Sequence, residues 1–242
     1  MKRVKLVVAY DGTNYCGWQV QKNGETIESV LNRAIGELTG EEIHVMGSSR
    51  TDAGVHACGN VAVFDTEARM AADKFSYALN QRLPEDIRIQ DSCEVPADFH
   101  PRFQKTVKTY EYRILNREFP LPAYRFNSHF IYRKLDVERM RQAAAYLIGE
   151  HFQSFCAAGA QVKTTVRTIY ALDVEKQGDL IILRITGNGF LYNMVRIIAG
   201  TLMKIGQGDW EPERIPEILA GCDRQLAGPT APARGLTLME IH

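Results

Sequence analysis

The sequence predicts an α+β protein built from two halves that divide near residue 104. Stretches with the two-residue period of strands and the 3.6-residue period of helices succeed one another in two strand-helix-strand sets. With 242 residues, 45% of them hydrophobic, the chain can bury a substantial core, as one large domain or two small ones. No sequence repeat relates the two halves. We therefore expect an N-terminal domain over 1–104 and a C-terminal domain over 105–242.

The first set opens with a strand and a helix. Apolar residues alternate from Val4 to Tyr10, as in a half-buried strand. Apolar side chains then recur at helical spacing over 27–38, where Thr26 can cap the helix and Gly40 can end it. The rest of this half is expected to contain strands at 42–47, 59–65 and 86–95 and a short helix at 71–80.

The second set, in the C-terminal half, also combines strands and helices. We expect a strand over 105–116 and a helix from about Asp136 to Gly149. The remaining elements are strands near 166–176 and 179–187, an apolar helix near 190–205, and a final strand after Gly235.

The charge is balanced overall and uneven along the chain. The formal net charge is zero, yet residues 100–141 carry 10 Lys or Arg against 4 Asp or Glu, interleaved with aromatic side chains. Such a segment suits contact with a folded polyanion. For any single residue of the segment, the ordinary alternative is a solvated charge or a core aromatic.

A loop bracketed by glycines, 47–57, holds the first candidate site. Arg50 and Asp52 stand two residues apart, off any predicted helix, so each side chain can be aimed independently. This arrangement suits a reacting carboxylate. A surface aspartate in an Asp-Ala-Gly turn is the plain structural alternative.

Arg196 is the second candidate. It lies within the apolar stretch from Phe190 to Met203, which reads as a buried helix. A buried guanidinium needs an anion, supplied either by a local structural acid or by Asp52, whose charge it would hold and orient. The alternative is an arginine whose head reaches the surface along the helix.

These two passages, together with Tyr10–Gln21, resemble signatures of the tRNA pseudouridine synthase A family. The resemblance continues through further motifs in the same order along most of the chain. These motifs are Phe99-His100-Pro101-Arg102-Phe103, Lys108-Thr109-Tyr110-Glu111-Tyr112, Val166-Arg167-Thr168-Ile169 and Gly235-Leu236-Thr237-Leu238.

The resemblance implies two α/β-sandwich domains with antiparallel, ferredoxin- or RRM-like sheets around a central cleft. It implies isomerisation of uridine to pseudouridine at positions 38, 39 and 40 of the tRNA anticodon arm, by a homodimer without a cofactor. By the same resemblance, Asp52 is the essential catalytic carboxylate, Arg196 pairs with it, and Arg50 takes the space of the flipped nucleotide or contacts a phosphate. Tyr110 would stack on the substrate base, and Leu236 would line its site.

Tyr110 and Tyr112 fall on one face of their predicted strand, and Tyr112 is expected in the core. Whether Asp52 attacks the sugar, adds to the base or removes a sugar proton stays open. Two other functions also stay open. One is a non-catalytic protein that binds structured RNA, and the other is a hydrolase that uses Ser49 or His56.

Several other classes of site are not indicated. The histidines lack the spacing of metal ligands, and five scattered cysteines indicate neither a disulfide framework nor a zinc site. No metal and no cofactor are expected. No apolar run approaches the ~20 residues of a membrane span. Because the charged start leads directly into a strand, we expect a cytoplasmic protein with no membrane contact.

Overall fold

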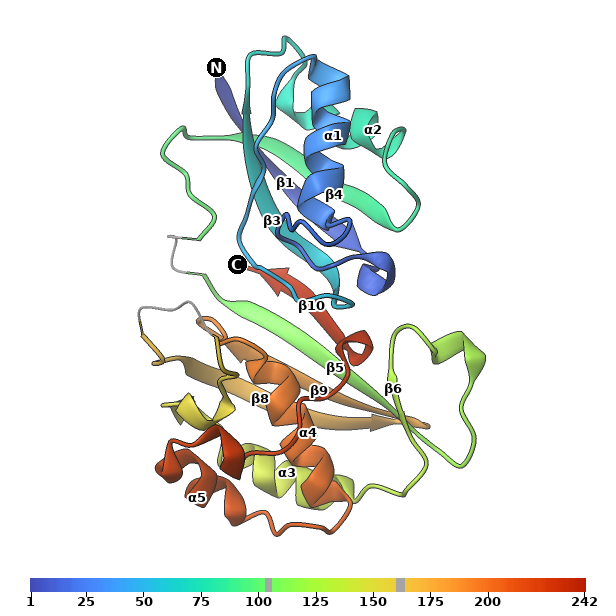
Figure 1. Ribbon diagram of the computed structural model, residues 1–242, viewed down its shortest axis with the longest axis vertical. Coiled ribbons are helices and arrows are strands. Elements are labelled where there is room, and N and C mark those ends of the chain that lie inside the picture. Colours follow the sequence, from blue (N-terminus) through green and yellow to red (C-terminus); the bar gives the residue numbers. More distant parts are fainter. Residues whose placement is uncertain (103–105, 160–163) are drawn as a thin grey trace. The chain divides into compact units, whose positions relative to one another are not determined.

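A computed structural model describes residues 1–102, 106–159 and 164–242, and it shows an α+β fold (Figure 1). This confirms the predicted class. Most strand pairs are antiparallel, whereas β5 and β6 run parallel, so the pairing is mixed. Phe103 of the fourth motif and Lys105 of the basic segment lie outside the described residues.

The chain divides into two compact units. Unit 1 comprises Met1–Thr106 and Leu238–His242, and unit 2 comprises Val107–Thr237. The last strand, β10 (Leu236–Ile241), therefore contributes most of its residues to unit 1.

Unit 1 is a sheet with helices on one face (Figure 1). Its strands follow the order β4-β1-β3-β10, and β2 lies off this path, paired with Ala62 and Val63 of β3. The elements are β1 (Lys2–Tyr10), α1 (Ile27–Thr39), β2 (Met46–Gly47), β3 (His56–Thr66), α2 (Phe75–Asn80) and β4 (Ile87–Val95).

The opening strand and helix form as the periodicity predicts. Alternate residues of β1 from Val4 to Tyr10 are buried, and α1 buries the positions that recur at helical spacing. Thr26 caps α1 in a reciprocal pair with Ser29, in which each side chain accepts the other residue's amide. Gly40 ends the helix with φ +75°, in the left-handed region that glycine tolerates best.

The strand expected over 42–47 is mostly irregular, so that prediction was wrong in its length. Only Met46 and Gly47 pair with β3. The amide of Val45 donates instead to the side chain of Asn32 on α1, at 2.8 Å. Ile43 and Val45 are nevertheless buried, and this alternation of buried residues produced the strand-like pattern.

Unit 2 is also a sheet covered by helices on one face (Figure 1). Its strands follow the order β5-β9-β8-β7, and β6 runs parallel to β5. The elements are β5 (Lys108–Asn116), β6 (His129–Ile131), α3 (Val137–Ala145), β7 (Gly149–Glu150), β8 (Thr168–Gln177), β9 (Leu180–Gly187), α4 (Met194–Gly206) and α5 (Arg214–Gly221).

The apolar helix begins later than the sequence predicts. Asn193 has φ +59° and precedes the first helical residue, Met194, so residues 190–193 do not join α4. Arg196 consequently lies in the first turn of the helix instead of its middle. Apart from half-buried Arg196 and Lys204, every residue of α4 is buried.

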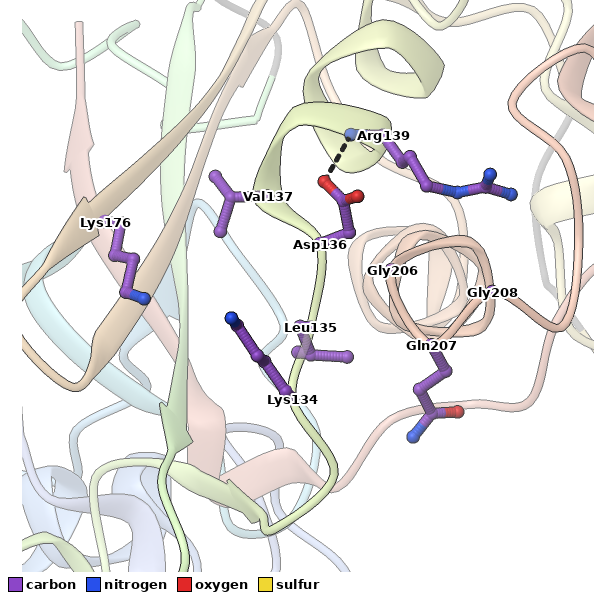
Figure 2. Close-up of a pocket in the computed structure, with 9 residues that line it drawn as sticks. All are labelled: Lys134, Leu135, Asp136, Val137, Arg139, Lys176, Gly206, Gln207 and Gly208. Atoms are coloured by element: carbon purple, nitrogen blue, oxygen red, sulfur yellow. Dashed lines mark hydrogen bonds between the residues drawn. The ribbon is translucent and has the colours of Figure 1, made fainter.

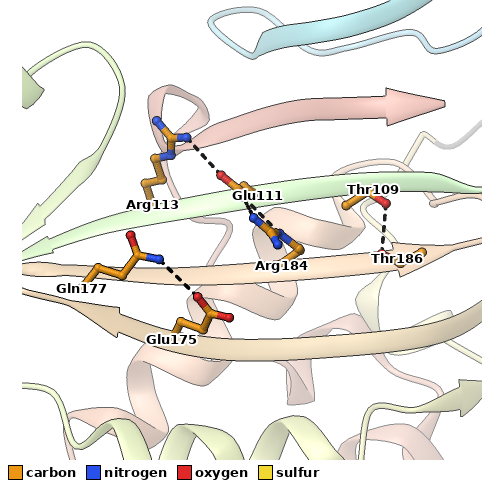
Figure 3. A network of polar contacts seen from close by, with 7 residues as sticks. All are labelled: Thr109, Glu111, Arg113, Glu175, Gln177, Arg184 and Thr186. Carbon is orange, nitrogen blue, oxygen red and sulfur yellow. Dashed lines mark hydrogen bonds and ion pairs between the residues drawn. The ribbon is translucent and has the colours of Figure 1, made fainter.

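The other face of the unit 2 sheet is polar (Figure 3). Glu111 is only 3% exposed there, and its carboxylate forms ion pairs with Arg113 of the same strand and Arg184 of β9. Burial opposes the charge of Glu111, but these two guanidinium groups outweigh it and hold the pKa of Glu111 below its ordinary value.

Over the described ranges, 1–102, 106–159 and 164–242, we find no helix with the length and apolar character needed to cross a membrane.

Candidate active site

The loop that carries Asp52 is anchored at alternate residues. Ser49 and Thr51 are buried, whereas Arg50 is exposed and Asp52 is half-buried. The carbonyl of Thr51 accepts a hydrogen bond from the amide of Trp18 at 3.0 Å, and its hydroxyl shares one of 2.7 Å with Tyr10. The two candidate residues thus alternate with residues that hold the loop in place.

A turn follows the candidate aspartate. The amide of Val55 donates to the carbonyl of Asp52 at 3.1 Å, and the amide of Gly54 donates to the carbonyl of Tyr15 at 3.3 Å. Both bonds fix the backbone on the C-terminal side of Asp52. The loop is therefore held on both sides of its carboxylate by neutral hydrogen bonds.

His56 closes the far end of the loop. Its Nδ1 accepts the amide of Gly12 at 3.1 Å and lies 3.1 Å from Oδ1 of Asp11. Partial burial raises the pKa of Asp11, but hydrogen bonds from Thr13 and the neighbouring His56 outweigh this effect and leave that pKa below its ordinary value. The His56 ring thus ties β3 to the start of the Tyr10–Gln21 motif.

Two glycines allow this motif to pack against the loop. At Gly17, where φ is +86°, a Cβ atom would lie 2.6 Å from the carbonyl oxygen of Thr51. At Gly47, a Cβ atom would lie 2.3 Å from the ring of Trp18. Any larger residue at these positions would displace the loop, because neither the backbone carbonyl nor the buried indole ring can yield.

Positive charge gathers beside the loop. Nε of Arg102 donates to the carbonyl of Gly47 at 2.8 Å, which brings its guanidinium near that of Arg50. Desolvation and the charge of Arg50 hold the pKa of Arg102 below its ordinary value. Two neighbouring guanidinium groups create a local field that attracts an anion such as phosphate.

In unit 2, the two tyrosines of β5 lie on the face that the helices cover. The hydroxyl of Tyr112 donates to the carbonyl of Pro232 at 2.9 Å, and its ring packs against Gly235. Burial raises the pKa of Tyr112 above its ordinary value, although the nearby charges of Arg196 and Arg234 lower it. Tyr112 is a core residue, as predicted.

Tyr110 is 7% exposed and meets Phe190 edge to face, with ring centroids 5.2 Å apart and an interplanar angle of 86°. Phe190 directly precedes the turn into α4. The tyrosine ring is therefore held in one orientation.

Arg196 is oriented by two uncharged acceptors. Its Nε donates to the carbonyl of Ala231 at 2.7 Å, and its Nη1 donates to Oδ1 of Asn193 at 2.7 Å. The segment that supplies Ala231 lies close against α4, because a Cβ atom at Gly200 would be 1.8 Å from the carbonyl oxygen of Pro229. Helix packing thus sets the direction of the guanidinium.

The predicted site residues are distributed over both units. Arg50 and Asp52 belong to unit 1, whereas Tyr110 and Arg196 belong to unit 2. Leu236, 6% exposed at the start of β10, also belongs to unit 2. The pairing of Asp52 with Arg196 stays a prediction.

Unit 2 also contains a pocket of about 610 Å³ that lies at the other end of α4 (Figure 2). It is lined by Lys134, Leu135, Asp136, Val137, Arg139, Lys176, Gly206, Gln207 and Gly208. Gly206 lies ten residues after Arg196 in α4, a rise of ~15 Å along the helix axis. None of the predicted site residues lines this pocket, so we do not assign the chemistry to it.

Within the part of the chain that the structure describes, no group of three or more His, Cys, Asp or Glu side chains is arranged to hold a metal ion.

Comparison with known proteins identifies the family. Residues 6–104 and 143–242 match the model of the tRNA pseudouridine synthase family. The chain belongs to this family. Proteins named tRNA pseudouridine synthase A are 48% identical to it in Acetivibrio thermocellus, 49% in Ruminiclostridium cellulolyticum and 50% in Brevibacillus brevis. Each comparison covers all of this chain and 99–100% of the relative.

Sequence reasoning did not find the side chains that hold the loop. Thr51 and Asn60, whose side chain accepts the amide of Ser49 at 3.2 Å, carry no recognisable spacing signal. Tyr10 read as the end of a strand and the start of a motif, not as a support of the loop. Their role depends on which residues of β1 and β3 lie opposite each other, and periodicity does not determine this register.

Proposed function

We propose that this chain isomerises uridine to pseudouridine at positions 38, 39 and 40 of the tRNA anticodon arm, as a cytoplasmic homodimer. Membership of the tRNA pseudouridine synthase family, over both matched segments, carries this proposal. The full-length similarity to proteins named tRNA pseudouridine synthase A supports it.

Asp52 is the proposed catalytic residue. The reaction breaks the bond between ribose and N1, turns the uracil and joins ribose to C5, with no net oxidation and no second substrate. A single carboxylate is adequate for such chemistry, because it can trap or stabilise an electron-deficient sugar. Attack on the sugar, addition to the base and removal of a sugar proton all remain compatible with an anchored, half-buried Asp52.

Arg196 is proposed to pair with Asp52 and keep it ionised. A cation in the first turn of a helix faces the positive end of the helix dipole, which disfavours it by roughly 0.3–1 kcal/mol. Ala231 and Asn193, two uncharged acceptors, help to orient this guanidinium. The proposed ion pair with Asp52 would compensate for this cost.

The target nucleotide must leave the base stack to reach Asp52. We propose that Tyr110 and Leu236 receive the flipped base, the tyrosine by contact with its ring. Phe190 supports the ring from the side, so the orientation of Tyr110 is fixed before the substrate binds. Arg50 takes the place of the flipped base or contacts a phosphate, and the neighbouring Arg102 strengthens its field.

In this proposal, each domain contributes part of the active site. The N-terminal domain, 1–104, carries the Asp52 loop, and the C-terminal domain, 105–242, carries Tyr110 and Arg196. In the proposed enzyme, their ferredoxin-like sheets form a central cleft that admits the anticodon arm.

The test is to incubate the protein with an unmodified tRNA transcript and map pseudouridine chemically. The wild type should modify uridines in the anticodon arm, and Asp52→Asn should form no product while still binding tRNA. Asp73→Asn removes an exposed carboxylate of the same unit and should remain active. Binding without modification by the wild type would indicate an RNA-binding protein, and an active Asp52→Asn would remove the aspartate from the mechanism.

A further inference from the structure

Asn60 is a fully buried polar residue that contacts the candidate catalytic loop. It lies on β3 and is 0% exposed. Its Oδ1 accepts the amide of Ser49 at 3.2 Å, and its Nδ2 donates to the carbonyl of Ser49 at 3.0 Å. Nδ2 also lies 3.3 Å from the hydroxyl of Tyr10, to which it donates. The carboxamide thus satisfies both backbone groups of one loop residue.

This clamp replaces the backbone ladder at the point where the ladder ends. Met46 and Gly47 pair with β3, and the amide of Ser48 still donates to the carbonyl of Val61 at 2.7 Å. At Ser49, the side chain of Asn60 replaces the backbone of β3 as the hydrogen-bond partner. The chain can therefore leave the sheet toward Arg50 while the buried amide and carbonyl of Ser49 keep their hydrogen bonds.

The register of β3 changes beside Asn60. Val8 lies opposite Asn60 and Tyr10 opposite Ala57, so one residue of β1 faces two residues of β3. Such a β-bulge redirects the side chains next to it, and bulges are frequent beside active sites. Here it brings Asn60 and Tyr10 to the same buried position under the loop.

We propose that Asn60 is a positioning residue for the reaction, which acts by fixing the Asp52 loop through Ser49. The inference rests on the proposed function, since it assumes that Asp52 is the reacting carboxylate. Ser49 and Thr51 flank Arg50, and Tyr10 joins the two anchors because its hydroxyl contacts both Asn60 and Thr51. Asn60 itself does not touch the substrate.

The expected effect falls on the chemical step. A displacement of about 1 Å in a reacting group costs on the order of 100-fold in rate. Asn60→Ala removes both bonds to Ser49, so kcat should fall by roughly 10- to 100-fold. The KM for tRNA should change by less than about threefold, because Asn60→Ala removes no group that is proposed to contact tRNA.

Asn80 provides a matched control. It forms the same two-bond clamp in the same unit, donating from Nδ2 to the carbonyl of Ile89 and accepting the amide of Ile89, both at 2.8 Å. This clamp joins α2 to β4 and does not involve the loop. Asn80→Ala should therefore lower thermal stability while leaving kcat within about twofold of the wild type.

The experiment compares kcat and KM of the wild type, Asn60→Ala, Asn80→Ala and Tyr10→Phe on the same tRNA transcript, with thermal unfolding of each protein. Tyr10→Phe removes only the hydroxyl that joins the two anchors, so it decides the question if Asn60→Ala does not fold. A fall of kcat in Asn60→Ala and Tyr10→Phe, but not in Asn80→Ala, is the expected result.

The inference is overturned if Asn60→Ala retains the wild-type kcat, if Asn80→Ala loses as much, or if only KM changes. Where Asn60→Ala is unfolded, a fully active Tyr10→Phe overturns it. An inactive wild type rejects the proposed function instead, so the two failures are distinguishable.

Discussion

Replacing Arg184 with methionine should destabilise the protein more than replacing its buried partner, Glu111, with glutamine. The reason is the unequal burial of the ion pair. The Glu111 side chain is 4% exposed, whereas those of Arg113 and Arg184 are 34% and 55% exposed. The cost of breaking such a pair depends on which charge is left inside.

The contacts set the magnitude. Arg184 donates two hydrogen bonds to Oε1 of Glu111, and Arg113 donates one to Oε2 at 3.0 Å. Arg184→Met leaves the buried carboxylate with Arg113 alone, a loss of ~2–3 kcal/mol. Glu111→Gln leaves two arginines that reach water and retains an acceptor, a loss of about 1 kcal/mol.

The stabilisation also has a defined pH dependence. The pKa of Glu111 in the folded protein lies below its ordinary value of 4.5. A carboxyl with a lowered pKa stabilises the fold above the unfolded pKa, and this stabilisation is lost as the pH falls through the folded value. The difference in stability between wild type and Glu111→Gln should therefore be full at pH 7 and shrink only below about pH 4.5.

Thermal unfolding at pH 7 and at a series of acidic pH values measures these differences. At pH 7, Arg184→Met should unfold at a temperature about 5–10 °C below the wild type, and Glu111→Gln about 2–4 °C below it. Glu118→Gln, at an exposed acid of the same unit outside this ion-pair network, is the control for a change of charge alone. A larger loss in Glu111→Gln than in Arg184→Met, or a difference that does not change with pH, would refute the argument.

Three further predictions concern the core, the loop and the substrate. Tyr112→Phe removes the hydroxyl that donates to Pro232 and should cost ~1 kcal/mol in urea unfolding; unchanged stability would contradict the assigned hydrogen bond. Gly17→Ala places a methyl group 2.6 Å from the carbonyl oxygen of Thr51 at a positive φ, so we expect at least a ~10-fold lower kcat, and normal activity would argue against close packing of the loop. Affinity for tRNA should fall steeply between about 50 and 200 mM salt if residues 100–141 contact phosphates, and a flat response would exclude that role.

Local signals in the sequence were enough where an element depends on its own residues. The helix α1 has its apolar stripe, its Thr26 cap and its Gly40 terminus all within one segment, and the structure confirms each of them. The strand β1 was likewise found from its alternation. Both elements bury one regular face, so periodicity alone reveals them.

Elements that depend on distant partners were missed or misplaced. The short strand β6 exists through parallel pairing with β5, which no local pattern encodes. The helix α5 is only eight residues long and contains Pro216 near its start, so its apolar stripe is too brief to stand out. The first turn of α4 was placed too early because Phe190, Leu191 and Tyr192 continue its apolar pattern, although Asn193 turns the backbone away.

The same distinction applies to the candidate site. The spacing of Arg50 and Asp52 within a glycine-bracketed loop could be read from the sequence. The clamp from Asn60 could not, because it requires both the bulge in β3 and the end of the β2 ladder to meet at Ser49.

The supports of the Asp52 loop differ in kind from those of the Glu111 carboxylate. Glu111 forms ion pairs with two arginines, which balance its charge, so this carboxylate stabilises the sheet. The Asp52 loop is held by Asn60, by the hydroxyl of Tyr10 and by the amide of Trp18, none of which carries a charge. Because these neutral hydrogen bonds fix the loop itself, they can hold Asp52 in position whichever group its carboxylate contacts.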